Sequence, residues 1–140
     1  MDIEELSVGD WVYSSFCEQP CKVTHIAYTE HGYSDVGVEN VVGLKDFASL
    51  TPIPLTAEIL EKNGFIEIVE DIYKCCVGEV YIEIGIYKPM FIYIGASVIT
   101  PEEVYDTDIL STTKANGGDF FVHDLQHALR LSGIDKKIKL

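Results

Sequence analysis

The sequence predicts an α+β fold in which a small N-terminal β-barrel module precedes an antiparallel sheet packed by one C-terminal helix. Three patterns support this prediction. Short segments that favour strands recur about every ten residues as far as Pro54, and apolar and polar residues alternate from Val80 to Tyr87. An apolar stripe with helical periodicity then runs from Asp119 to Leu131. At 140 residues the chain is long enough to bury a core of its own.

The first module, residues 1–55, begins with a turn at Gly9-Asp10 and a strand that ends at Tyr13. Further strands are expected at Cys21–Tyr28, Val36–Val42 and Phe47–Ile53, with a turn at His31-Gly32. The opening Leu6-Ser-Val-Gly-Asp-Trp-Val12 has the form Leu-x-x-Gly-Asp-x-Val, which is common in Src-homology-3-like barrels. We therefore predict a meander that curls into a small barrel of that kind.

The second module, residues 56–140, opens with a short helix. Thr56 is a natural N-cap and Asn63-Gly64 a natural stop. An antiparallel meander should follow, then a long polar loop, the principal helix and an edge strand. We expect the two modules to form one compact unit. The predicted ranges are strands at 65–68, 72–77, 79–87 and 91–95, a loop at 100–118, a helix at 119–131 and an edge strand at 134–140.

The charge balance disfavours nucleic acids as partners. The chain carries 23 acidic against 10 basic residues, a net charge of −13, and such a surface repels phosphate backbones. The same charge attracts a protein with a basic surface. No segment approaches the roughly 20 apolar residues of a membrane span, and the acidic N-terminus does not read as a signal peptide. We therefore predict a cytoplasmic protein that contacts no membrane.

Two histidines, His123 and His127, provide the strongest candidate for a metal site. They are four residues apart on the last helix, as in the His-Glu-x-x-His motif of zinc hydrolases, but Asp124 takes the place of the glutamate. The alternative is that His123 bonds within the fold while His127 is solvated. The spacing of the four cysteines (Cys17, Cys21, Cys75 and Cys76) does not favour zinc either. We predict no cofactor, no metal and no catalytic set, hence a protein that is not an enzyme.

Tyrosines provide the candidate binding residues. Tyr81 and Tyr87 fall on the solvent-facing side of the predicted 79–87 strand, and tyrosine is enriched in contact surfaces. The alternative is that they pack as ordinary half-buried sheet residues. Both interpretations place them on the polar face of the sheet.

Two segments resemble a family of short uncharacterised proteins from gut Bacteroidales genomes and their phages. One contains Pro52-Ile-Pro-Leu-Thr56 at the start of the first helix, and the other contains Val122-His-Asp-Leu-Gln126 in the last helix. The resemblance extends in order along the chain, but only these two motifs are specific. It implies a phage or mobile-element setting in a bacterial host cell, and it implies no activity and no catalytic residue.

The resulting hypothesis is a phage or prophage accessory protein that acts by protein–protein contact. One alternative is a protein that binds or sequesters a neutral or cationic small ligand, with the 100–118 loop as a lid. An anionic ligand would need local bases, which are scarce in this chain. A second alternative is a metal-dependent hydrolase that uses His123 and His127.

Overall fold

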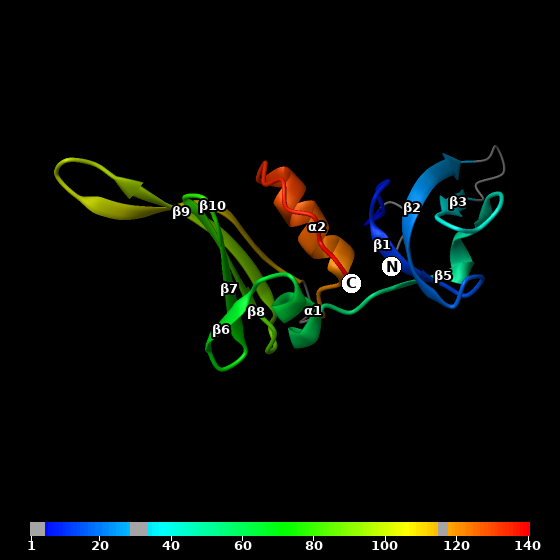
Figure 1. Cartoon of the computed structure of the whole chain (residues 1–140), viewed down its shortest axis with the longest axis horizontal. Coiled ribbons are helices and arrows are strands. Elements are labelled where there is room, and N and C mark those ends of the chain that lie inside the picture. The colour runs from blue at the N-terminus through cyan, green and yellow to red at the C-terminus, as the bar shows by residue number, and fades with distance from the viewer. Residues whose placement is uncertain (1–4, 29–33, 115–117) are drawn as a thin grey trace. The chain divides into compact units, whose positions relative to one another are not determined.

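The computed structural model describes residues 5–28, 34–114 and 118–140. These residues form two antiparallel five-stranded sheets and two α-helices, so the predicted mixture of helix and strand is confirmed and strand predominates (Figure 1). The chain divides into two compact units. Unit 1 contains Met1–Ile53 with Phe121–His123, and unit 2 contains Pro54–Phe120 with Asp124–Leu140.

The sheet of unit 1 has the strand order β4-β3-β2-β1-β5. Strand β2 is central, and β1 beside it pairs antiparallel with both β2 and β5. The two outer strands, β4 and β5, do not pair with each other, so the described residues form no closed barrel. The predicted Src-homology-3-like barrel is therefore not confirmed. The strands are β1 (Trp11–Ser14), β2 (Gln19–Tyr28), β3 (Ser34–Val38), β4 (Lys45–Asp46) and β5 (Leu50–Pro52).

Local turn chemistry sets several strand limits in unit 1. Strand β3 stops at Val38, four residues short of the prediction, because a turn follows in which Asn40 has a φ of 64°. The predicted strand at Phe47 instead begins as a 3-10 turn, η2 (Phe47–Ser49), in which the Asp46 carboxylate accepts a hydrogen bond of 2.8 Å from the Ala48 amide. The predicted turn at His31-Gly32 lies outside the described residues.

The core of unit 1 is aliphatic and is closed at one end by the predicted Gly9-Asp10 turn. Gly9 has a φ of 95°, and the fully buried Asp10 carboxylate accepts a 2.8 Å hydrogen bond from the Ser7 amide. This bond satisfies a buried charge, which would otherwise be costly. The buried core residues are Leu6, Val12, Cys21, Val23, Val36, Val38 and Leu50.

Unit 2 contains α1 (Ala57–Lys62), most of α2 (Val122–Leu131) and a sheet in the order β10-β9-β8-β7-β6. Thr56 caps α1 as predicted, accepting a bond from the Ile59 amide at 3.4 Å, and Gly64 follows its end with a φ of 85°. Both helices lie on one side of the sheet (Figure 1). The strands are β6 (Ile66–Val69), β7 (Ile72–Val77), β8 (Val80–Gly85), β9 (Phe91–Ile99) and β10 (Val104–Thr113).

The predicted loop at 100–118 is wrong over most of its length. Val104–Thr113 forms β10, which pairs antiparallel with β9 from Val104↔Ile99 to Thr113↔Phe91. The segment looks like a loop in the sequence because it is rich in Asp, Ser and Thr, and most of its residues are exposed, as an outer strand allows. A bulge between Asp108 and Leu110 also breaks its alternation.

The predicted edge strand at 134–140 is also absent from the described residues, in which 134–140 has no helix or strand. Asn63 holds this segment instead. Its side-chain amide donates to the Lys139 carbonyl, and its side-chain oxygen accepts from the Lys139 amide, both at 2.7 Å. Ile138 is buried beside this clasp. No helix that the described residues form is long and apolar enough to cross a membrane.

Candidate functional site

The sheet of unit 2 has one covered face and one open face. Alternation along β7, β8 and β9 sends Ile82, Ile84, Ile92 and Ile94 into the core, where none has exposed surface. The residues between them point the other way and are half-buried or exposed. We call this second surface the open face: Lys74, Cys76, Tyr81, Glu83, Tyr93 and, on β10, Asp108.

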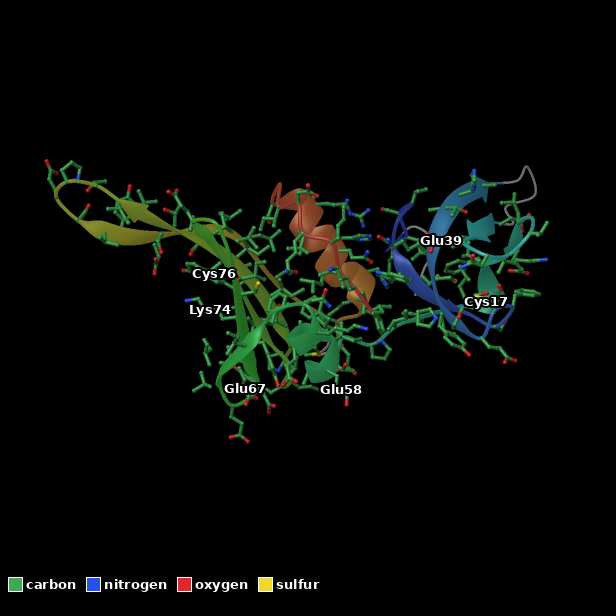
Figure 2. All side chains as sticks on the ribbon, in the orientation of Figure 1. Cys17, Glu39, Glu58, Glu67, Lys74 and Cys76 are labelled. Carbon is green, nitrogen blue, oxygen red and sulfur yellow. The ribbon has the colours of Figure 1, made fainter. Side chains whose placement is uncertain are left out.

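Lys74 and two tyrosines make ordered contacts on the open face. The Tyr81 and Tyr93 rings lie 5.9 Å apart at 44°, and the Lys74 ammonium lies 4.5 Å from the centre of the Tyr81 ring. Lys74 also lies 3.9 Å from the Glu83 carboxylate, and Figure 2 shows it projecting from the side of the sheet away from the helices. A cation over an aromatic face adds electrostatic attraction to the packing.

Gly95 makes room for this arrangement. A Cβ atom at position 95 would come within 2.9 Å of the Tyr81 ring and of both tyrosine hydroxyls. Tyr81 is the cross-strand partner of Gly95, so its ring lies over a backbone without a side chain. The glycine therefore allows the two tyrosines to cover the middle of the open face.

Tyr93 connects the open face to β10. Its hydroxyl donates a short hydrogen bond to the Asp108 carboxylate. This bond, followed by one with Tyr81 and by burial, raises the pKa of Tyr93 above its ordinary value. The phenol therefore stays protonated and remains a donor. A second polar link between the strands joins the Ser97 hydroxyl to the Asp106 carboxylate at 3.2 Å.

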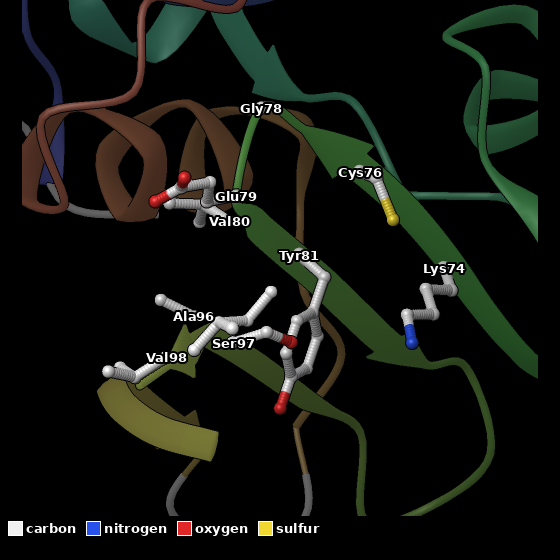
Figure 3. A pocket seen from close by; sticks show the side chains of 10 residues that line it. Lys74, Cys76, Gly78, Glu79, Val80, Tyr81, Ala96, Ser97 and Val98 are labelled. Carbon is white, nitrogen blue, oxygen red and sulfur yellow. The ribbon is translucent and has the colours of Figure 1, made fainter. Parts of the chain in front are cut away.

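A pocket of about 480 Å³ opens beside Tyr81. Its walls come from β7, the turn at Gly78-Glu79, β8 and the far half of β9. Figure 3 shows the Tyr81 side chain between those of Ser97 and Lys74. The lining combines an aromatic ring, a thiol, an ammonium group and small side chains: Lys74, Cys76, Gly78, Glu79, Val80, Tyr81, Ala96, Ser97, Val98 and Ile99.

Beyond this pocket the last two strands extend past the sheet. Strand β8 pairs with β9 only as far as Ala96, and the Ser97 amide still donates to the Glu79 carbonyl at 3.3 Å. Val98 and Ile99 pair with β10 alone. We call residues 97–106 the arm, and Figure 1 shows it projecting from the rest of the sheet. Its turn is closed by a 2.8 Å bond from the Thr100 amide to the Glu103 carbonyl. Apolar residues on it are exposed: Ile99 by 77%, Val104 by 69% and Tyr105 by 45%.

Acidic side chains surround these apolar residues. The open face, the pocket rim and the arm together contain one base, Lys74, and six acids. The acids are Glu79, Glu83, Glu102, Glu103, Asp106 and Asp108. The exposed apolar and aromatic residues of this surface therefore lie among acidic side chains.

The structure separates the two predicted binding tyrosines. Tyr81 lines the pocket and so belongs to the candidate site. Tyr87 lies beyond the end of β8 at Gly85, where its ring packs edge-on against Phe91 at 6.1 Å. Tyr93 was not selected from the sequence. The sequence signal that could have identified it is the alternation Ile92-Tyr93-Ile94 in the predicted 91–95 strand. The register then places Tyr93 opposite Glu83, on the same face as Tyr81.

The two candidate metal ligands occupy different environments on α2. His123 has no exposed surface and stacks on the Phe121 ring at 5.7 Å. His127, which was expected to be solvated, is half-buried. Asp124 forms a 3.0 Å ion pair with Lys114. Within the described ranges, no three His, Cys, Asp or Glu side chains come together in a way that could hold a metal ion.

The four cysteines are free thiols with different accessibility. Cys76 is exposed at the pocket, whereas Cys21 is buried in unit 1. Burial, together with the nearby Cys17, raises the pKa of Cys21 to about 12. Because the thiolate is the reactive form, burial and the raised pKa disfavour reaction at Cys21.

None of the known proteins compared with this chain matches it, whether as a family model, a curated protein or a solved structure.

Proposed function

We propose that the protein is a non-enzymatic interaction module that binds a protein partner with a basic surface through its open face and arm. The observation that carries the proposal is the arm, because its exposed apolar residues lie within a strongly acidic surface. The pocket beside Tyr81 adjoins the arm through Val98 and Ile99, so one partner can contact both.

The arm's composition favours a binding role over a packing role. A two-stranded ribbon is at best marginally stable in water, since it has little core. Ile99 and Val104 are cross-strand partners, yet most of their surface remains exposed. Covering these side chains would remove apolar surface from water and stabilise the ribbon. A partner that does so gains from the hydrophobic effect.

The charge of the surface indicates the chemistry of the partner. Six acids against one base disfavour a second copy of this chain, because like charges would meet. A partner rich in lysine and arginine would be attracted from a distance, and its cations could lie over Tyr81 and Tyr93. Such binding should weaken as salt is added.

Unit 1 supports a more specific version of the proposal. Its β1 pairs with both β2 and β5, and the 3-10 turn η2 precedes β5. Together with the Leu6–Val12 motif, this connectivity supports an open relative of the Src-homology-3-like barrel. We place the module among phage or prophage accessory proteins of the bacterial cytoplasm on the strength of the two motifs at Pro52–Thr56 and Val122–Gln126.

The pocket also leaves a second proposal open. A volume of about 480 Å³ is enough for a small ligand, and its tyrosine, thiol and lysine would suit a neutral aromatic one. The lid that this alternative assumed is absent, since residues 104–113 form β10. Binding of a protein partner needs no lid, and the arm would contact that partner directly.

The experiment compares two matched double variants in quantitative pull-downs from a bacterial lysate. Ile99→Ser with Val104→Ser removes the apolar residues of the arm. Val42→Ser with Leu131→Ser removes two apolar residues elsewhere that are even more exposed, at 94% and 80%. We expect wild type and control to recover a basic protein that the arm variant does not recover. Its recovery should also fall when the salt is raised from 50 mM to 300 mM, because the screening length is then roughly halved.

Equal recovery of every bound protein by the arm variant and the control would overturn the proposal. Circular dichroism shows whether both variants are folded. We expect that they are, because all four residues are exposed and neither pair supports a core.

A further inference from the structure

A second pocket, in unit 2, has the opposite charge to the rest of the protein. It has a volume of about 420 Å³ and lies where the end of α1 meets the segment 135–139. Four of the ten basic residues in the chain line it, with one acid among the lining residues. These residues are Lys62, Asn63, Val77, Asp135, Lys136, Lys137 and Lys139.

The pocket is built by a buried polar contact. Asn63 is 6% exposed and makes two 2.7 Å hydrogen bonds with the backbone of Lys139, 76 residues away in sequence. Its amide also donates to the Ile59 carbonyl at 2.8 Å. This clasp brings Lys139 to the end of α1 that carries Lys62, and both line the pocket. Ile138 is buried, whereas its neighbours Lys137 and Lys139 are exposed.

The lysines are not accounted for by local ion pairing or by the helix end. Asp135 lies 3.7 Å from Lys137, but both side chains are almost fully exposed, and such pairs are weak. Lys62 is in the last turn of α1, where a cation interacts favourably with the helix dipole. That effect concerns Lys62 alone, since the other three lysines come from the segment after α2. The lining keeps a charge of about +3, four lysines against one aspartate.

We propose that this pocket binds a small anion with more than one negative charge, of the phosphate-ester class. Several ammonium groups around one concavity suit phosphate oxygens, because each is a compact charge with three donors. The volume suits a sugar phosphate or the phosphates of a nucleotide. A nucleic acid would extend beyond the pocket onto a chain with a net charge of −13, which favours a small ligand. The scarcity of bases in the sequence therefore does not exclude an anionic ligand, because the fold gathers four of them.

Isothermal titration with pyrophosphate tests this proposal. The variant Lys136→Gln with Lys139→Gln removes two charges from the pocket. The control Lys45→Gln with Lys88→Gln removes two charges elsewhere, so both proteins have the same net charge. We expect saturable binding by wild type and control, and a loss of about tenfold or more in the pocket variant, because hydrogen bonds to charged groups are strong.

Two results would overturn the proposal: no saturable binding of pyrophosphate by wild type, or equal binding by the two double variants. Competition by glucose 6-phosphate, with glucose itself inactive, would support the phosphate-ester class. Thermal melts without ligand show whether the pocket variant is folded. The arm and open face are unchanged in these proteins, so the outcome is independent of the proposed protein partner.

Discussion

The covered and open faces of the unit 2 sheet share their strands but differ in what their residues do. Ile82, Ile84, Ile92 and Ile94 have no exposed surface and are the same residue type. Between them, Tyr81, Glu83 and Tyr93 each make a specific polar or aromatic contact and stay within reach of solvent. If the open face binds a partner as proposed, stability and recognition depend on alternate residues of the same strands. Substitutions on one face should change stability, and those on the other should change binding.

The largest difference between the faces is expected at two adjacent residues of β8. Ile84→Ala leaves a cavity in the covered face and should lower the free energy of unfolding by about 2–5 kcal/mol. Glu83→Ala removes an ion pair of 3.9 Å on the open face and should cost less than about 1 kcal/mol. Urea denaturation of the two variants measures both values. Similar costs would mean that the open face contributes to the core.

A smaller effect is expected at the glycines of the open face. A Cβ atom at Gly85 would run into the Phe91 ring, which must then move, so Gly85→Ala should cost about 1–3 kcal/mol. Gly95→Ala meets the outer ends of Tyr81 and Tyr93 at 2.9 Å, and these can shift at lower cost. Thermal melts should rank Gly85→Ala as the more damaging. The reverse order would show that the tyrosine pair is held more rigidly than the Phe91 ring.

The smallest effect concerns the hydrogen bond between Tyr93 and Asp108, and it depends on pH. Because the pKa of Tyr93 is raised in the folded protein, its contribution to stability is fully present below the unfolded value near 10. The contribution is lost as the pH rises through the folded pKa. Tyr93→Phe lacks this titration, so the stability difference between wild type and variant should shrink above about pH 10. A difference independent of pH from 8 to 11 would contradict this assignment.

Patterns that repeat along the chain could be predicted, whereas features that depend on a partner segment could not. The alternation from Val80 and the caps of α1 depend on neighbouring residues, and both are found in the structure. Strand β10 was missed because an edge strand exposed over most of its length needs no apolar alternation. The Asn63 clasp was also missed, since nothing near Asn63 in the sequence indicates that Lys139 will be its partner.

For the candidate site, alternation alone was enough to place Tyr81 on the open face. It could not supply the register that brings Tyr93 beside it, or the pairing that continues β9 and β10 into an arm. The basic pocket was hidden for the same reason. Three of its lysines lie within four residues of the sequence, but the fourth, Lys62, joins them only through the fold.

The Asn63 clasp has a consequence for the order in which the protein is made. The sheet of unit 1 has all its strands once Pro52 has left the ribosome, so it can form while synthesis continues. Unit 2 cannot close the contact between Asn63 and Lys139 until 76 further residues have followed Asn63. During that interval the two side-chain bonds of Asn63 to the Lys139 backbone cannot form, although its bond to the Ile59 carbonyl within α1 can. The second unit therefore completes its fold late, after translation of the segment that also carries three of the four pocket lysines.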